Sequence, residues 1–264
     1  MDTRFWGPSG WKLLHSVAYS YPKKPTFDDK RNYGIFFNNL KNVLPCKYCR
    51  ISLKKFIKNL PIEPYLSSRN KLRTWIYHIH NKVNNKLRRQ KLLKTPNPKL
   101  KEVDKMYREI LKKKCELRGW DFIYCIAFNY PKKKNSVSIE KMQHYITFFK
   151  LLGEVIPCKK YRKLYNQALS ELPVEKYIDS RKNLTHWLHL VNCRINESLS
   201  EKNKKYKLIC SNYESRRAGA CKKKNYRGKK TCQLSRNDLK KIKTIKRTKN
   251  NKITKQSLFT RYIS

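Results

Sequence analysis

One stretch of sequence occurs twice and decides the fold: FFNNLKNVLPCKYCR at residues 36–50 and FFKLLGEVIPCKKYR at residues 148–162. Aligned without a gap at an offset of 112, residues 36–84 and 148–196 share 17 identities in 49 positions. Upstream, the pattern Trp11…Tyr21-Pro22 matches Trp120…Tyr130-Pro131 at an offset of 109. Because self-similarity at a fixed register indicates a duplicated structural unit, we predict one unit of roughly 90 residues used twice.

Within each copy, apolar residues recur at helical spacing, and prolines end the runs. In the first copy the periodic stretches cover residues 11–21, 33–44, 46–59 and 67–89. No segment alternates apolar and polar residues for long enough to predict a strand. We therefore expect an all-α protein: a four-helix bundle over residues 1–94, a degenerate helical repeat of the same unit over 95–200, and a basic, partly disordered tail over 201–264.

The charge of the chain is extreme, with 64 Lys and Arg against 18 Asp and Glu and a formal net charge of +46. Such a charge is typical of proteins that bind nucleic acid. However, the chain is also rich in Asn and Ile and holds only seven Gly, which A/T-rich codons would produce without any functional cause. Both interpretations stay open at this point.

Low hydropathy and the cysteine count narrow the class of protein. The mean hydropathy is −0.83 and no long apolar run or apolar N-terminal leader is present. We expect neither a membrane span nor a secretory signal, and hence a soluble protein made in a reducing compartment. Nine cysteines in such a compartment favour redox or metal chemistry over a scaffold of structural disulfides.

The motif Cys46-Lys47-Tyr48-Cys49 follows a proline, where the third helix is expected to begin. A helix N-terminus and the neighbouring Lys47 and Arg50 stabilise a thiolate, so one of the two cysteines should have a lowered pKa. The spacing also permits a disulfide within one helical turn, as in dithiol–disulfide enzymes. A redox role is the favoured interpretation, while a zinc site and the absence of any special role stay open.

The predicted fourth helix carries polar residues at positions 77, 80, 81 and 84 on one face. Groups of this kind are more often satisfied polar residues on a half-buried helix. Beside Trp75 they would equally suit an adenine and a ribose in a mostly apolar pocket. His78 and His80 could also complete a Cys₂His₂ zinc set, but their spacing places the two rings on different helical faces.

Three blocks in order carry a family resemblance: WGPSGWKLLH at residues 6–15, the CxxC at 46–49, and HNKVNNKL at 80–87. Together they resemble the Erv/ALR family of FAD-linked sulfhydryl oxidases, over about residues 4–90. The A/T-rich composition, the duplication and the lack of a targeting sequence look most similar to members from large cytoplasmic DNA viruses. This resemblance implies the host cytoplasm, at the viral factory, and the virion as settings.

The resemblance also implies roles for single residues. Cys49 would be the flavin-proximal thiolate, and Cys46 the outer sulfur that an incoming thiolate attacks. The reaction implied is oxidation of protein dithiols through a Cys46–Cys49 disulfide, with electrons passing to FAD and then to molecular oxygen to give hydrogen peroxide. No metal is expected. The implied FAD-binding residues are Trp6, Gly7, Trp11, His15, Tyr19, His80, Asn81, Val83, Asn84 and Lys86.

The second copy departs from the family pattern at its chemical positions. Tyr161 stands where the second cysteine should be, Tyr124 replaces the first-helix histidine, and Asn192-Cys193 replaces the His-Asn pair. We therefore predict that this copy forms no CxxC disulfide and binds no FAD. Since family members are typically dimers, the second copy would take the partner's place in an intrachain pseudo-dimer; a homodimer, a recruitment surface and an inert copy remain alternatives.

Three cysteines of the tail, Cys210, Cys221 and Cys232, lie at equal intervals of 11 residues. The family often uses a second, flexible cysteine pair, so a shuttle is one interpretation, beside a structural disulfide or metal site and unpaired thiols. The tail carries much of the positive charge and could contact nucleic acid. The alternative function is accordingly a basic helical nucleic-acid-binding protein whose CxxC is structural or zinc-linked.

Overall fold

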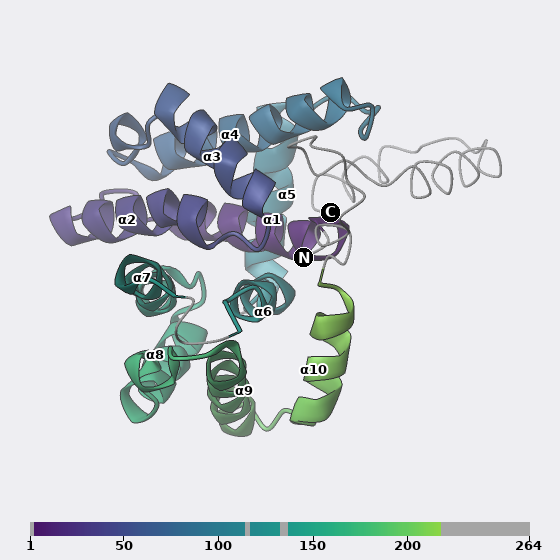
Figure 1. Cartoon of the computed structure of the whole chain (residues 1–264). Coiled ribbons are helices and arrows are strands. Elements are labelled where there is room, and N and C mark those ends of the chain that lie inside the picture. The colour runs from purple at the N-terminus through teal and green to yellow at the C-terminus, as the bar shows by residue number, and fades with distance from the viewer. Residues whose placement is uncertain (1–2, 114–116, 133–136, 218–264) are drawn as a thin grey trace, which may run out of the picture.

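The computed structural model describes residues 3–113, 117–132 and 137–217, and every regular element within these ranges is helical (Figure 1). The prediction of an all-α protein is therefore confirmed. Two short 3₁₀ helices, η1 (Glu63–Tyr65) and η3 (Val174–Tyr177), join longer ones. The α-helices are α1 (Thr3–Ser20), α2 (Phe27–Val43), α3 (Lys47–Asn59), α4 (Arg69–Arg89), α5 (Leu100–Lys113), α6 (Trp120–Phe128), α7 (Ile139–Val155), α8 (Lys159–Glu171), α9 (Arg181–Ser198) and α10 (Tyr206–Ser215).

Local capping explains where several of these helices begin. Thr26 and Asp29 form a reciprocal capping box at the start of α2, which satisfies two backbone donors that the helix itself leaves unpaired. The hydroxyls of Ser68 and Ser180 cap α4 and α9 in the same register of the two copies. The four helices expected in the first copy are thus present. The third and fourth have nearly the expected bounds, whereas α2 begins six residues before the expected stretch.

The first helix begins earlier than the sequence pattern indicates, at Thr3 rather than near Trp11. It runs through Pro8, which cannot donate the hydrogen bond to the preceding turn and lowers the helical preference of this segment. The extra turns are stabilised by a tertiary contact instead. Trp6 is buried there, and its ring lies 5.6 Å from that of Phe122 on α6.

The two copies share their core contacts as well as their helices. In the first copy the indole nitrogen of Trp75 donates to the carbonyl of Leu60, at the end of α3, over 3.0 Å. In the second, Trp187 donates to Leu172, at the end of α8, over 2.7 Å. Both rings are buried, so each ties the last helix of its bundle to the third. The duplication seen in the sequence is therefore a duplication of structure.

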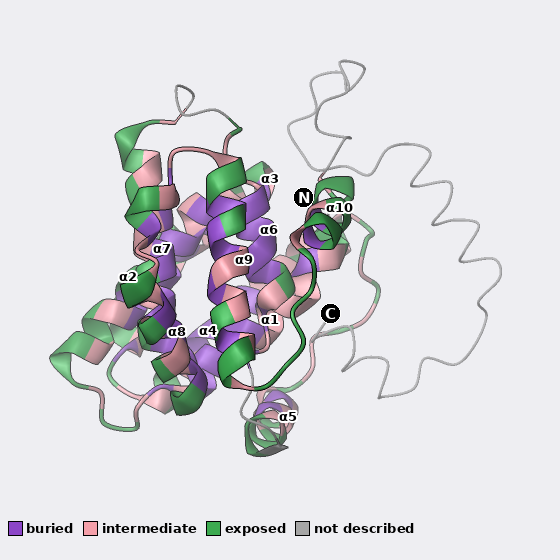
Figure 2. Cartoon of the chain, turned by 90° about the horizontal axis from the view of Figure 1, so that it is seen from below, coloured by how far each residue is buried: buried purple, intermediate pink, exposed green. Residues whose placement is uncertain are grey.

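Equivalent helices also form the contact between the copies, because α1 packs on α6 and α2 packs on α7 (Figure 1). Phe36 and Phe148, which occupy the same position in the two copies, stack on each other with ring centroids 5.7 Å apart. A residue that meets its own counterpart lies on the symmetry axis of a two-fold interface. One continuous hydrophobic core consequently runs through both copies (Figure 2).

Reciprocal polar contacts point to the same pseudo-two-fold relation. The positive charge of Arg162 of the second copy opposes the rise that burial causes in the pKa of Tyr33 of the first. The counterparts of these residues are Arg50 and Tyr145, and the charge of Arg50 acts in the same direction on the pKa of Tyr145. Such paired contacts are expected of an isologous interface.

The helices α5 and α10 extend the repeated unit beyond four helices. The helix α5, which lies in the segment expected to belong to the second copy, packs on α1 of the first, and α10 packs on α6. The outer side of α5 is exposed where this helix lies beside the bundle (Figure 2). No helix in the described part of the chain combines the length and the apolar character that crossing a membrane requires.

Candidate functional site

The CxxC lies at the start of α3, as the sequence predicts. Cys46 is the N-cap residue in an extended conformation, and Cys49 lies in the first turn. The guanidinium of Arg50 reaches back and donates to the carbonyl of Leu44 over 2.5 Å, which ties the helix start to the end of α2. Cys46 is only 5% exposed, whereas Cys49 is half-buried.

Helical spacing divides α3 into three faces. Cys46 begins the row that includes Leu53 and Ile57, which are buried in the bundle core. Cys49 begins a second row, which includes Ser52 and Phe56. Positions 47, 51, 54, 55 and 58 form the third row and are exposed to solvent. The two cysteines of the motif therefore belong to different faces of one helix.

The row that Cys49 begins leads into a cavity of about 720 Å³ between α3 and α4. Its size lies within the range of ligand and cofactor pockets. Lys86, one of the residues expected to bind the cofactor, lies in its wall and donates to the hydroxyl of Ser52 over 2.8 Å. The lining contains five cations and no acid, which suits an anionic group: Ser52, Lys55, Phe56, Asn59, Lys82, Asn85, Lys86, Arg88 and Arg89.

An aromatic cluster lies on the face of α4 that meets α1. The rings of Trp11 and His80 stack with centroids 3.7 Å apart and planes 9° from parallel. His15 Nε2 and His80 Nδ1 are 3.0 Å apart and share a hydrogen bond. Tyr19 lies one turn further along α1, with its ring near that of His15. The structure thus brings together four residues that the sequence places up to 69 positions apart.

The helix α5 adds two residues that the sequence interpretation missed. The buried ring of Tyr107 stacks on His15 at 4.6 Å. Asp104 accepts the hydroxyl of Tyr19 and pairs with Arg73 over 3.0 Å. An apolar row at helical spacing within residues 100–113 was the available signal: Val103, Met106, Tyr107 and Ile110.

Burial decides the charge state of this cluster. Complete burial lowers the pKa of His15 to about 3. The pKa of His80 also lies well below its ordinary value, through burial and, to a lesser extent, through the neighbouring His15. Both imidazoles are therefore neutral near pH 7, and one donates to the other. Burial raises the pKa of Tyr107, so the hydroxyl stays protonated as well.

The other residues expected at the cofactor differ in burial, in hydrogen-bond partners and in the part of the fold that they contact. On α4, Asn84 donates to Asn97 over 3.3 Å, and Val83 is half-buried. The side-chain oxygen of Asn81 is buried and has no hydrogen-bond partner in the described part of the chain. Trp6 packs on the second copy rather than in the aromatic cluster, and Gly7 follows it on α1.

The cysteines expected to shuttle electrons are only partly described. Cys210 is half-buried on α10, whereas Cys221 and Cys232 lie outside the described residues. His80, considered as a zinc ligand, is engaged with His15 and Trp11 instead. Within the described ranges, no three His, Cys, Asp or Glu side chains are grouped so as to hold a metal ion.

The second copy keeps the geometry of this site with different chemistry. Tyr124 and Asn192 occupy the positions of His15 and His80, and their side chains meet in the same way, with Tyr124 donating over 3.5 Å. A hydroxyl–amide contact has replaced the imidazole pair. Burial raises the pKa of Tyr124, so this contact also remains uncharged.

The α10 helix repeats the role of α5. Tyr213 stacks on Tyr124 at 5.0 Å and on Phe128 at 5.3 Å, as Tyr107 packs on the matching first-copy residues. The cationic wall is not repeated. The counterpart of Lys86 is Ser198, with which α9 ends, so the positions of the last two arginines of the cavity fall beyond the helix.

A protein-family model described as the Erv1 / Alr family matches residues 8–108 and, a second time, residues 117–217. The chain belongs to the Erv1/Alr family. The two matches correspond to the two structural copies, the first including most of α5 and the second all of α10. The resemblance stated from the three sequence blocks is confirmed, and the degenerate copy is itself a family domain.

Named relatives of this Erv1/Alr chain match it over about a third of its length. A probable FAD-linked sulfhydryl oxidase of Acanthamoeba polyphaga mimivirus is 44% identical over 85 residues, which are 32% of this chain and 59% of that protein. The mitochondrial FAD-linked sulfhydryl oxidase of Saccharomyces cerevisiae is 41% identical over 90 residues, 34% of this chain and 47% of that one. This chain thus spans about half the length of these relatives.

Among solved structures, the crystal structure of the yeast Erv1 core is 35% identical in sequence to this Erv1/Alr chain. The match covers 41% of this chain and 86% of that one, with a TM-score of 0.37.

Proposed function

We propose that this chain is an FAD-dependent thiol oxidase that forms disulfides in protein substrates and passes their electrons to molecular oxygen, giving hydrogen peroxide. One observation carries the proposal above all. The CxxC begins a helix of which one face, the face of Cys49, leads directly into a cofactor-sized cavity lined by cations. The names of the mimivirus and yeast relatives, both FAD-linked sulfhydryl oxidases, support the same activity.

The residues present fit FAD. Lys82, Lys86 and Arg89 on α4 offer charge-assisted hydrogen bonds to a diphosphate. The buried oxygen of Asn81, which has no partner in the described chain, can accept a hydrogen bond from a ligand. The stacked rings of Trp11 and His80 offer a flat aromatic surface for a base. When bound there, FAD supplies an acceptor for two electrons and a centre at which oxygen is reduced.

The cysteines carry the thiol chemistry. A substrate thiolate forms a bond to the sulfur of Cys46 while the Cys46–Cys49 bond breaks, and Cys49 leaves as a thiolate. The second thiol of the substrate, after losing its proton, then displaces Cys46, so that the substrate leaves as a disulfide and both cysteines are reduced. The N-terminus of α3 stabilises the negative charge on Cys49, at the start of the row that leads to the cavity.

Access to Cys46 is restricted, because this sulfur belongs to a residue that is only 5% exposed. Thiol–disulfide exchange requires the incoming sulfur to approach the attacked one directly. An incoming thiolate therefore has only a small exposed area of Cys46 to approach.

The second copy serves, in this proposal, as an intrachain partner in a pseudo-dimer. Its support is the packing of equivalent helices and the self-contact of Phe36 with Phe148. We propose that the chain needs no homodimer for activity.

The viral factory and virion remain the proposed settings, and the mimivirus relative supports a viral origin. Nucleic-acid contact through the tail, and electron shuttling by Cys210 with Cys221 and Cys232, also remain proposals, since most of the tail lies outside the described residues.

The proposal is tested with purified protein. We expect a visible flavin spectrum and oxygen consumption with dithiothreitol, whereas a colourless protein that holds zinc and binds nucleic acid would support the alternative function. Cys49→Ser and Cys46→Ser should both reduce oxygen consumption to the background rate. Cys193→Ser, on the second copy, is the control and should retain full turnover. Unchanged turnover in Cys49→Ser would exclude the mechanism.

A further inference from the structure

The solvent face of α3 forms a lysine stripe, which we define as Lys47, Lys54, Lys55 and Lys58 together with Ile51. All five are exposed, and their spacing places them in one row along the helix. Lys55, on the side of the row toward α4, also lines the cavity. The row begins between the two cysteines of the CxxC. Ile51 is 57% exposed, an unusual position for a large aliphatic side chain, one turn from the reacting sulfurs.

The overall composition of the chain does not explain this stripe. The matching helix of the second copy, α8, lies in the same lysine-rich chain and has the same fold. Its cations are confined to the first five residues, and it ends in an acid. The positions of the last three lysines of the stripe are held there by uncharged residues: Asn166, Gln167 and Ser170. A full-length basic face is therefore found on the copy that has a CxxC and not on the copy that lacks one.

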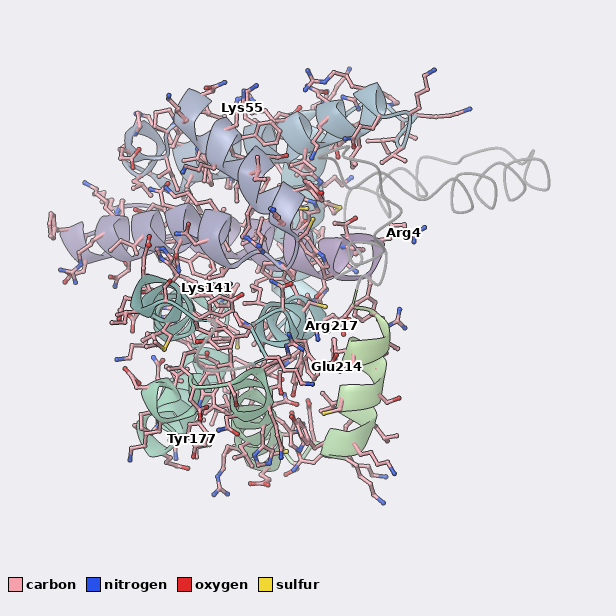
Figure 3. The ribbon with its side chains drawn as sticks, in the orientation of Figure 1. Arg4, Lys55, Lys141, Tyr177, Glu214 and Arg217 are labelled. Carbon is pink, nitrogen blue, oxygen red and sulfur yellow. The ribbon has the colours of Figure 1, made fainter. Side chains whose placement is uncertain are left out.

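The second copy adds positive charge near the start of the stripe. Lys141, on α7, lies close enough to Arg50 that the charge of Arg50 lowers its pKa, after the larger effect of burial. Neither side chain forms an ion pair with an acid of the described ranges. In Figure 3, Lys55 lies on α3 and Lys141 on α7, on opposite sides of α2. Lys141 therefore adds to the positive field around the start of α3 and is not part of the stripe itself.

We propose that the lysine stripe is the docking surface for protein substrates, and that it selects dithiols flanked by an acidic segment. This inference rests on the proposed oxidase function and names its substrate class. From position 47 to position 58 the helix rises about 16 Å, the span of roughly five extended residues. The acidic residues should accordingly lie within about five positions of the attacking cysteine, with an apolar residue among them to contact Ile51.

Charge complementarity at an exposed surface acts mainly on encounter. A single exposed ion pair contributes little, whereas several cations on one face raise the association rate about tenfold or more at low salt. The selectivity should therefore appear in kcat/KM and weaken as salt screens the charges. The kcat/KM of small uncharged dithiols should not depend on the lysine stripe.

The test compares two peptides with the same dithiol, one with an aspartate-rich flank and one with an asparagine-rich flank, on the full-length flavin-loaded protein. We expect kcat/KM to be about tenfold higher for the acidic peptide at low ionic strength and nearly equal for the two at high salt. The double variant Lys54→Glu/Lys58→Glu should abolish this preference. Its turnover of dithiothreitol should match that of the wild type, which shows that the oxidase itself is intact.

A matched control makes the same change of charge on the second copy. Lys160→Glu/Lys163→Glu reverses two exposed lysines of α8 and should retain the preference. Equal kcat/KM for the two peptides in the wild type, or the same loss in both double variants, would overturn the proposal. So would an oligonucleotide that binds the wild type tightly and the stripe variant weakly without any peptide preference. Failure to oxidise dithiothreitol would instead contradict the proposed function.

Discussion

The two copies of the family domain differ in what they have kept. Trp75 and Trp187 make the same hydrogen bond to the end of the preceding helix, so the scaffold contacts are shared. At the positions of the candidate site, the second copy has a tyrosine–asparagine contact in place of the imidazole pair and Tyr161 in place of the second cysteine. The comparison teaches that the fold of this domain and its chemistry depend on separate sets of residues.

The physical reason lies in the energetics of each set. A buried indole that satisfies a carbonyl cannot be removed without leaving a cavity and an unpaired acceptor. The imidazole pair proposed to meet the cofactor is more easily exchanged, since another polar pair, Tyr124 and Asn192, fills the same space in the second copy. The bundle therefore persists with different chemistry at this position.

Truncating the two indoles should give the largest effect. Trp75→Ala and Trp187→Ala are each expected to lower the free energy of unfolding by about 3–5 kcal/mol, because both remove a large buried ring and a hydrogen bond. Chemical denaturation monitored by circular dichroism measures this loss. If the two costs differed by more than about 2 kcal/mol, the scaffolds would not be energetically equivalent.

Converting the first site to the chemistry of the second should separate function from fold. In His15→Tyr/His80→Asn we expect unchanged helical content but at least a tenfold weaker affinity for FAD, about 1.4 kcal/mol or more. The reverse exchange, Tyr124→His/Asn192→His, should create no second flavin site, because the cationic wall is absent there. Flavin fluorescence during titration measures both, and tight flavin binding by the first variant would contradict the assignment.

The imidazole pair should also make stability depend on pH, with a smaller effect. Below about pH 6.5 the unfolded chain protonates both imidazoles, while burial keeps His15 neutral down to about pH 3 in the folded protein. The unfolded state then binds more protons, so stability falls as the pH drops. From pH 6.5 to 5.5 the loss should be about 1 kcal/mol per histidine.

Denaturation at the two pH values, compared between the wild type and His15→Tyr/His80→Asn, isolates this term. The variant carries the uncharged pair of the second copy and should show a correspondingly flatter dependence. Parallel pH profiles would mean that the imidazoles are not buried as neutral groups.

Much of the fold is predictable from the sequence, because a repeat at a fixed offset and helical periodicity are local signals. The helices around Cys46 and Trp75 lie where the sequence predicts them. The early start of α1 is not predictable, since it depends on the contact of Trp6 with Phe122, a residue 116 positions away. Local propensity at Pro8 indicates the opposite.

For the candidate site, the sequence predicts some of the residues that meet but not the neighbours that α5 contributes. The family resemblance implied a common site for Trp11, His15, Tyr19 and His80, and the structure brings these residues together. Tyr107 was missed because an apolar row on a helix shows that the helix packs somewhere, but not on which neighbour. The lysine stripe was missed for another reason: in so basic a chain, its meaning emerges only when α3 is compared with α8.

The stoichiometry of flavin per chain tests the division between the copies most directly. Protein concentration from amino-acid analysis and flavin released by denaturation together give the ratio. The account predicts one FAD per 264-residue chain, held by the first copy and lost in His15→Tyr/His80→Asn. Two FAD per chain, or a single FAD that survives this exchange, would contradict it.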